Sequence, residues 1–280
     1  MTSDAGTLDG AAAGDALGAP GSRVRSSFGG ERLERACLAE LALRGDEHIL
    51  DVGSGDGRFA RALARGLGAE GSLVAVEGSL DRLAAARAHA RDEAEEGLVE
   101  FRQGSAPSLP LAEEERGSFD LVHARFLLEH VRDPAGVAAS LVAATRPGGR
   151  IVLVDDDHDR LELWPEAPAV SALWRAYIRT HDRLGHDPYV GRRLVQLLHE
   201  GGAHPTRVTV VPWSSCAGSA DWQATVDDLA GVLGGARALM LAAGVATDAH
   251  VDAGLDELTA WSRRPEASLW YGLCWAEGRH

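Results

Sequence analysis

The feature of this 280-residue sequence that most constrains its fold is a glycine-rich turn between an apolar segment and a helical one. The stretch EHILDVGSGDGRF places Gly53, Gly55 and Gly57 directly after a run typical of a buried strand. Glycines let the backbone pass close to a ligand, and a helix starting there offers unpaired N–H groups. The nicotinamide fingerprint needs glycine at the position of Arg58. The turn indicates a ligand-binding loop of another kind, with a plain tight turn as the alternative.

Further apolar segments alternate with helical ones along the chain. Besides the strand before the glycine turn, we expect strands at 73–76, 98–102, 119–124, 150–156, 208–211 and 268–274. Continuous apolar strands that alternate with amphipathic helices predict a parallel sheet covered on both faces. The expected fold class is α/β, a doubly wound, Rossmann-like, mostly parallel seven-stranded sheet. Helical insertions near 160–188 and 219–264 are expected to form a lid over the strand ends.

The chain ends and the cysteines bear on domain organisation and location. Residues 1–30 hold too few large apolar groups to order alone, so we predict a flexible tail followed by one domain at 31–280. The N-terminal segment lacks the pattern of a secretory signal, and no apolar run is long enough for a membrane span. The three cysteines lie far apart, without metal-ligand spacing. We expect a cytoplasmic protein, and the lysine-free, alanine-rich composition is typical of a GC-rich bacterial genome.

The charge balance limits the partners. With 28 Lys+Arg against 42 Asp+Glu, the formal net charge is −14. Nucleic-acid binding relies on clustered cations that release counterions, and this sequence has no such run. We therefore expect no nucleic-acid partner and no membrane insertion, while the oligomeric state is not written in the sequence.

Five segments occur in the order and at the spacings of a known family. They resemble the class I S-adenosylmethionine-dependent methyltransferases, in the small-molecule branch that includes the ubiquinone and menaquinone methyltransferases. The segments are ILDVGSGDG (49–57), VAVEGS (74–79), FRQGSAPSLPL (101–111), FDLVHARFLLEHVRDP (119–134) and RPGGRIVLVDDD (146–157). The resemblance covers about residues 31–213 and returns near residue 268. It implies S-adenosyl-L-methionine as cofactor and S-adenosyl-L-homocysteine as product.

The resemblance assigns cofactor-binding roles to the first two segments. Gly53 and Gly55 would pass under the methionine part of the cofactor, with Ser54 in the same loop. Asp51 would lie near the cofactor ammonium. Glu77, at the end of the next strand, would accept both ribose hydroxyls.

Four further positions complete the implied cofactor site. Gly78 would let the chain turn beneath the adenine. Ser105 stands where the family usually has aspartate, so its hydroxyl would contact the adenine amino group without charge. The backbone N–H of Ala106 would face the adenine ring. Arg125 would line the methionine moiety or pair with an acidic residue, two roles that the sequence leaves open.

Candidates for a general base come from histidines beyond the fourth and fifth strands. His158, after the aspartates at 155–157, is the first choice because imidazole titrates near neutrality, with a solvated loop residue as the alternative. His130, in LLEHV, is the second candidate, with packing or capping as its alternative. Tyr177 and His181 share one face of the inserted helix, which could border a pocket but is more simply expected to be solvated.

Two further groups of residues have weaker interpretations. The aspartates at 155–157 could hold a hard cation, but no further ligand is identified, so solvated charge is favoured and no metal ligand is assigned. Most tryptophans are expected in the core, with one or two lining an apolar acceptor pocket: Trp164, Trp174, Trp213, Trp222 and Trp270.

The expected function is S-adenosylmethionine-dependent methylation of a small molecule, such as a secondary metabolite or a quinone-like acceptor. The alternatives are an RNA or protein methyltransferase, and a cofactor-binding methyltransferase fold used by a non-methylating enzyme or scaffold. The sequence does not specify the acceptor or the atom methylated.

Overall fold

The computed structural model describes residues 30–280, so the predicted tail lies outside the described residues except for Gly30, which begins a helix. The α-helices are α2 (Gly30–Leu41), α3 (Arg58–Ala64), α4 (Leu80–Asp92), α5 (Pro134–Ala144), α6 (Pro168–Leu184), α7 (Leu194–Glu200), α8 (Trp222–Gly235), α9 (Arg237–Ala242) and α10 (Asp248–Trp261). The strands are β1 (His48–Val52), β2 (Ser72–Glu77), β3 (Glu100–Gln103), β4 (Phe119–Arg125), β5 (Thr145–Asp155), β6 (Glu162–Trp164), β7 (His204–Cys216) and β8 (Ser268–Arg279).

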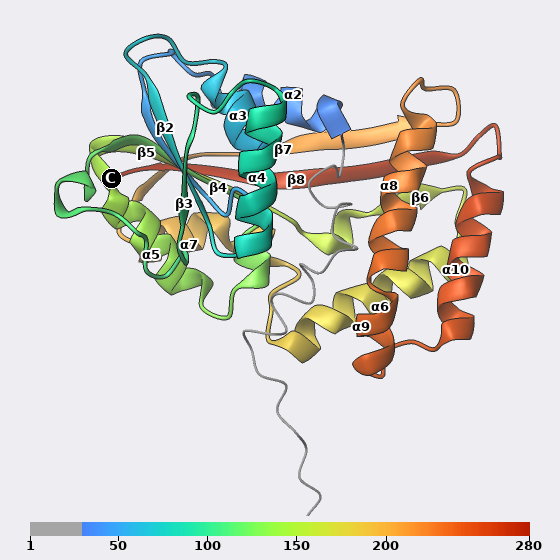
Figure 1. The fold of residues 1–280 in the computed structure, drawn as a ribbon. Coiled ribbons are helices and arrows are strands. Elements are labelled where there is room, and N and C mark those ends of the chain that lie inside the picture. Colours follow the sequence, from blue (N-terminus) through green and yellow to red (C-terminus); the bar gives the residue numbers. More distant parts are fainter. Residues whose placement is uncertain (1–29) are drawn as a thin grey trace, which may run out of the picture.

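These strands form one sheet in the order β3-β2-β1-β4-β5-β8-β6, with β7 on the other edge of β8 (Figure 1). Strands β1 to β5 are parallel to their neighbours, and β8 runs antiparallel to β5, β6 and β7. The predicted fold class is confirmed. The eighth strand is the short β6, whose three residues are too few for a sequence pattern to reveal.

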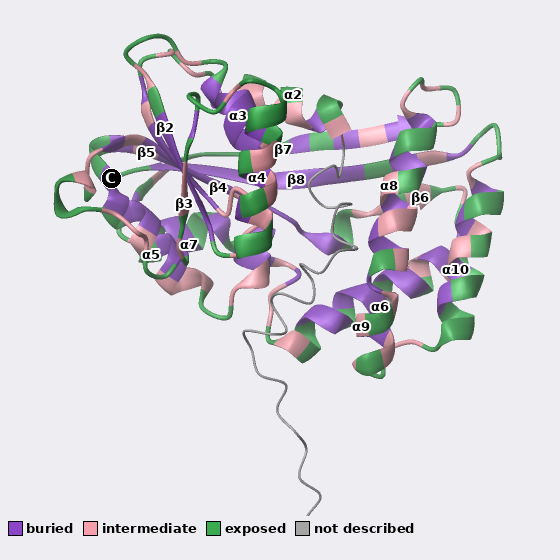
Figure 2. Ribbon diagram, in the orientation of Figure 1, coloured by how far each residue is buried: buried purple, intermediate pink, exposed green. Residues whose placement is uncertain are grey.

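Alternate residues of the central strands face opposite sides of the sheet, as the period of a strand requires. Ile49 and Leu121 belong to one buried cluster, which includes residues of α2 and α3. Leu50 and Val122 belong to a second cluster, which includes residues of α5 and α7. Helices therefore cover both faces, and the central strands are buried (Figure 2). This double cover explains why the strands are continuous apolar runs.

Strands β7 and β8 are much longer than the short segments expected near 208–211 and 268–274. Their pairing runs from His204 opposite Arg279 to Cys216 opposite Ser268, so the ribbon extends beyond the end of β5. Helices α6, α8 and α10 lie beside this extension (Figure 1). Within the helical insertion expected near 219–264, α8 and α9 are separated at Ala236.

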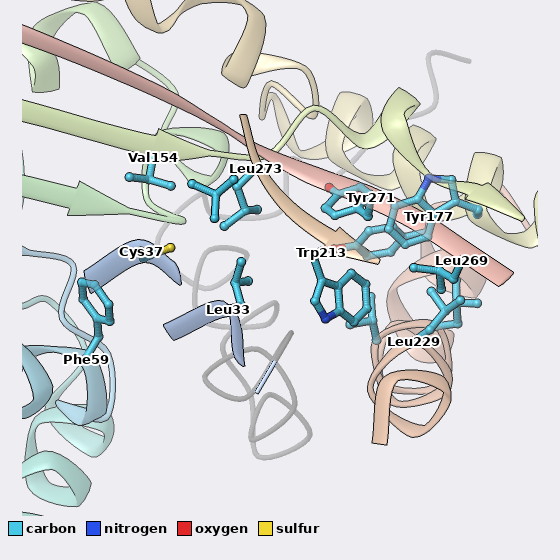
Figure 3. Close-up of a cluster of buried hydrophobic side chains, with 14 of the residues drawn as sticks. Leu33, Cys37, Phe59, Val154, Tyr177, Trp213, Leu229, Leu269, Tyr271 and Leu273 are labelled. Carbon is cyan, nitrogen blue, oxygen red and sulfur yellow. The ribbon is translucent and has the colours of Figure 1, made fainter. Parts of the chain in front are cut away.

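A hydrophobic cluster fills the space between this ribbon and the added helices. Tyr177 of α6, Trp213 of β7 and Tyr271 of β8 gather there beside Leu229 of α8 (Figure 3). The rings of Trp213 and Tyr271 meet edge to face, with centroids 6.1 Å apart. Within the described part of the chain, no helix combines the length and apolarity needed to cross a membrane.

The three free cysteines provide a test of this packing. Burial raises the pKa of the Cys37 thiol to about 11 and also raises that of Cys274, whereas Cys216 is exposed and a hydrogen bond from Ser219 lowers its pKa. Because the thiolate is the reactive form, we expect a disulfide reagent at mildly alkaline pH to modify Cys216 rapidly and the others only after unfolding. Mass spectrometry of the labelled peptides checks this, and rapid native labelling of Cys37 would contradict the packing of α2.

Candidate cofactor and acceptor site

The glycine loop crosses from β1 over the end of β2. The N–H groups of Gly53 and Ser54 both donate to the Val76 carbonyl, at 2.8 and 3.1 Å. Gly53, Gly55 and Gly57 have φ values of +78°, +60° and +73°, in the region that favours glycine. The loop is thus held against the sheet by its own backbone, in a conformation that glycine permits.

The three glycines differ in what surrounds them. A Cβ at Gly57 would lie 2.7 Å from the ring of Phe101 and 2.9 Å from Ala86, so this glycine is needed for packing. A Cβ at Gly55 would meet nothing within 4 Å, so the loop borders open space there. The Ser54 hydroxyl is buried and has no hydrogen-bond partner among the described residues. The loop therefore combines open space at Gly55 with a buried hydroxyl at Ser54 that still lacks a hydrogen-bond partner.

Glu77 ties the loop to the next turn. Its two carboxylate oxygens accept hydrogen bonds from the N–H groups of Gly55 and Ser79, each at 2.8 Å. The side chain lies at the end of β2 and is buried. A carboxylate oxygen can accept more than one hydrogen bond, so Glu77 retains capacity for a ligand hydroxyl at the same edge.

The turn after β3 lies beside Glu77, as the resemblance implies for an adenine site. The N–H of Gly104 donates to the Glu77 carbonyl at 3.0 Å, and a Cβ at Gly78 would lie 3.5 Å from the Gly104 carbonyl oxygen. Ser105 is exposed, whereas Ala106 is buried and its carbonyl accepts a hydrogen bond from Ser140. The structure therefore brings Gly78, Ser105 and Ala106 near one end of the glycine loop.

Asp51 has a partner that the sequence reasoning missed. Its Oδ1 lies 2.7 Å from Nδ1 of His123, and both side chains are buried. The two residues are register partners in neighbouring strands β1 and β4. The other ring nitrogen, Nε2, has no hydrogen-bond partner among the described residues. His123 therefore fixes the orientation of the Asp51 carboxylate beside the glycine loop.

Arg125 packs against aromatic rings. Its guanidinium carbon lies 4.0 Å from the ring centre of Phe59 and 5.0 Å from that of Phe126. The described residues show no carboxylate in ion-pair contact with it, so its expected pairing with an acidic residue is not found. A guanidinium over an aromatic face gains a cation–π attraction.

A polar network lies beyond the ends of β4 and β5. His158 is only 3 % exposed, so its interpretation as a solvated loop residue is wrong. Its Nε2 is 2.8 Å from Oε2 of Glu129, and its Nδ1 is 3.1 Å from the hydroxyl of Tyr271. That hydroxyl donates to Asp156 at 2.7 Å. Both ring nitrogens of His158 are therefore engaged.

Glu129 is the centre of this network, and sequence reasoning did not single it out although it stands in the quoted LLEHV segment. It is completely buried, and its Oε1 lies 3.1 Å from Nε2 of the half-buried His130. Tyr177 and His181 are also buried, so the expectation of a solvated face on α6 is wrong. Their rings lie 5.1 Å apart, and the ring of His181 lies 5.2 Å from that of His158.

The aspartates at 155–157 are all buried, which contradicts their interpretation as solvated charge. One carboxylate oxygen of Asp155 accepts the N–H groups of Leu127 and Leu128, at 3.1 and 2.7 Å, and holds the turn after β4. Burial, with the nearby Glu129 and Asp156 carboxyls, raises the pKa of Asp155 well above its usual value.

Asp157 points to a different set of partners. It forms ion pairs with Arg160 and Arg192, at 3.1 and 2.8 Å. The three consecutive carboxylates thus serve three separate contacts, a turn, a tyrosine and two arginines. They do not converge as ligands of a hard cation.

A cavity adjoins this network. It encloses about 310 Å³, including its open mouth. Its lining joins acidic and imidazole groups to aromatic and aliphatic ones: Phe126, Glu129, Asp156, His158, Trp174, Tyr177 and Val232. Of the five tryptophans considered in the sequence, Trp174 lines this cavity. Its indole N–H donates to the His158 carbonyl at 2.7 Å.

Comparison with known proteins adds to this geometry. Residues 50–153 match the model of a family described as a methyltransferase domain. This match supports the resemblance of the glycine-loop half of the chain to the class I S-adenosylmethionine-dependent methyltransferases. The chain is 32% identical over 119 residues to demethylmenaquinone methyltransferase of Lactococcus lactis, covering 42% of this chain and 46% of that one. It is 40% identical over 114 residues to ubiquinone biosynthesis O-methyltransferase of Methylococcus capsulatus, covering 40% and 44%.

A solved structure extends the likeness in fold over more of the chain. A protein of Bacillus halodurans C-125 superposes with a TM-score of 0.58 at 20% identity, covering 89% of this chain and 99% of that one. At this identity the likeness shows the fold alone. The chain spans about half the length of the curated relatives it matches.

Proposed function

We propose that the protein transfers a methyl group from S-adenosylmethionine to a small, largely apolar molecule bound in the cavity. The observation that carries this proposal is the contact between the glycine loop and Leu127, which lies in the turn between two cavity-lining residues, Phe126 and Glu129. A Cβ at Gly53 would lie 3.0 Å from the Leu127 side chain, and two residues later Glu129 lines the cavity. A cofactor held by the loop and an acceptor in the cavity would therefore be close neighbours, as direct transfer requires.

The residues of the loop fit the cofactor. A Cβ at Gly55 would meet no protein atom within 4 Å, the buried Ser54 hydroxyl has no hydrogen-bond partner among the described residues, and the Glu77 carboxylate holds the loop at Gly55. We assign the ribose hydroxyls to Glu77 and the methionine moiety to Gly53 and Asp51. When bound, the cofactor supplies an activated methyl group on a sulfonium.

The other predicted positions take the remaining cofactor contacts in this proposal. Gly78, Ser105 and Ala106 lie together beside the end of β2, where they would border the adenine. Arg125 would line the methionine side through its position at the end of β4, with its guanidinium held over Phe59. The protein mainly aligns the two reactants.

The cavity favours a neutral acceptor with a polar group at one end. Trp174, Tyr177 and Val232 give it apolar lining, and Glu129 and His158 supply its polar end, where the His158 ring packs against both aromatic rings. The net charge of −14 disfavours phosphate-rich acceptors. Relatives named for demethylmenaquinone and ubiquinone support an aromatic acceptor of the quinol type. We propose that the acceptor hydroxyl meets the Glu129–His158 pair.

Two variants of α8 test the acceptor cavity. Val232 lines it, so Val232→Phe should fill it, whereas Ala224 is exposed on the same helix and Ala224→Phe should not. We expect Val232→Phe to raise the KM for a quinol probe by about tenfold or more while leaving S-adenosylmethionine affinity unchanged. The measurements are calorimetric titration of the cofactor and transfer of radiolabelled methyl to a panel of quinols and catechols.

Each alternative function predicts a different result. Wild-type protein that binds no S-adenosylmethionine would remove the proposal altogether. Transfer of the radiolabelled methyl group to tRNA or protein, but to no small phenol, would favour the RNA or protein methyltransferase alternative. Cofactor binding without transfer to any acceptor in a metabolite extract would favour a non-methylating role.

A further inference from the structure

Side chains with metal-binding atoms converge beside the cavity, which two of them, Glu129 and His158, line. They come from the turn after β4, from the segment after β5 and from α6. One ligand atom from each of Glu129, His158 and His181 lies within 4.8 Å of the other two, and all three residues are buried. A second set, His130, His181 and His186, shares His181 and meets the same distance.

We propose that Glu129, His158 and His181 bind one divalent transition-metal ion at the polar end of the acceptor cavity. Two imidazoles and one carboxylate suit zinc, cobalt or iron(II) better than magnesium or calcium, which prefer oxygen ligands. Three protein ligands leave at least one coordination position for a small molecule. No metal ligand is expected from the sequence, because these three residues are separated along the chain and join only in the fold.

The hydrogen bond between Glu129 and His158 shows where the ion would lie. Oε2 and Nε2 are 2.8 Å apart, so one proton lies between them, whichever atom carries it. A divalent ion would replace that proton and attract both atoms more strongly. Metal binding should therefore release a proton to the solvent, because ligands must be deprotonated.

The groups behind the ligands have the arrangement expected around a metal. Ligand histidines usually donate their second nitrogen to a neighbouring oxygen, which fixes the ring. Here Nδ1 of His158 contacts the Tyr271 hydroxyl at 3.1 Å, and that hydroxyl donates to Asp156. His130, at 3.1 Å from Oε1, likewise orients the Glu129 carboxylate. We therefore assign His130 and Tyr271 as positioning residues and not as ligands.

The role of the ion rests on the proposed function. The acceptor hydroxyl would bind the ion, and its pKa would fall, so that it loses a proton to water. The resulting oxyanion would form a bond to the methyl carbon as the carbon–sulfur bond breaks, with the electron pair going to sulfur. His158 is then a ligand in place of a general base, which agrees with the engagement of both its nitrogens.

Cobalt provides a direct probe of the site. We expect titration of the metal-stripped protein with Co²⁺, without cofactor or acceptor, to give visible d–d absorption that saturates at one ion per chain. Proton release should accompany it in weakly buffered solution. Zn²⁺ should displace the cobalt, whereas Mg²⁺ should not. Absence of saturable absorption, or equal displacement by Mg²⁺, would overturn the proposal.

Variants locate the ion. Loss of a ligand in His181→Phe or His158→Phe should weaken Co²⁺ binding by more than about 100-fold, and Tyr271→Phe by about 10- to 100-fold. His250→Phe, at an exposed position, should have no effect. Retained S-adenosylmethionine binding shows that each variant is folded. If His186→Phe abolishes the absorption while His158→Phe retains it, the ion lies in the other set of histidines and the proposed ligands are wrong.

Separate readouts keep this proposal distinct from the proposed function. If the protein binds Co²⁺ saturably but transfers no methyl group, the metal site is supported. Only the proposed methyltransferase activity is then contradicted. If metal-stripped protein with chelator present transfers methyl groups as fast as before, the proposed role of the ion is contradicted. The proposed methyltransferase activity is not.

Discussion

Replacing Glu77 by glutamine is expected to weaken S-adenosylmethionine binding by about 100-fold or more, which corresponds to about 3 kcal/mol. The carboxylate accepts N–H groups with both oxygens, from Gly55 on one side and Ser79 on the other. An amide has only one oxygen, so its NH₂ group would face one of these donors. The loop would then lose a fixing contact at the edge where we place the ribose. Calorimetric titration of purified Glu77→Gln measures the effect.

A matched control separates binding from folding. Glu70 lies just before β2 and is exposed, so Glu70→Gln should bind the cofactor as the wild type does. The thermal midpoint of both variants should be recorded alongside. Unchanged cofactor affinity in a folded Glu77→Gln would show that the carboxylate does not hold the ligand.

Alanine substitutions at Gly55 and Gly57 are expected to have opposite effects on stability and binding. Both glycines have positive φ, so each substitution costs about 1 kcal/mol of backbone strain. At Gly57 the added Cβ also overlaps Phe101 and Ala86, so the total loss of unfolding free energy should reach about 2–3 kcal/mol. At Gly55 the Cβ meets no protein atom within 4 Å, so the strain alone remains. It enters the space that we assign to the cofactor.

Urea denaturation and cofactor titration of the two variants together test this difference. Gly57→Ala should unfold at clearly lower urea concentration, and Gly55→Ala should lose cofactor affinity with little loss of stability. Because the two positions share a loop and a backbone conformation, each serves as the control of the other. Full cofactor affinity in Gly55→Ala would mean that the ligand lies elsewhere.

The glycine loop and Glu77 could be predicted because their signals are local. A strand, a turn and a helix follow one another within a few residues, and Glu77 ends the next apolar run. The length of β7 and β8 could not be predicted, since the first half of β7 is mostly exposed while β8 is buried almost throughout, so the two strands share no single pattern. Their extent depends on mutual pairing, which no short window of sequence contains.

The acceptor end of the site depends on contacts between distant segments. Tyr271 reaches His158 only because β8 lies antiparallel beside β5 and continues past its end. A signal for the burial of His181 did exist. Val170, Trp174 and Tyr177 form an apolar stripe on α6, and His181 continues it at the next helical step. A histidine that ends an apolar stripe is a better candidate for a site than one on a charged face.

The position of β8 in the sheet has a consequence for how the chain folds. This strand comes after all the others in the sequence, yet it separates β5 from β7 and is the sole strand partner of β6 and β7 in the described part of the chain. Strands β6 and β7 therefore cannot join the sheet until β8 is available. Contacts of such long sequence separation slow folding and leave strand edges exposed meanwhile. During synthesis, the edge of β5 would be the surface most in need of protection from aggregation.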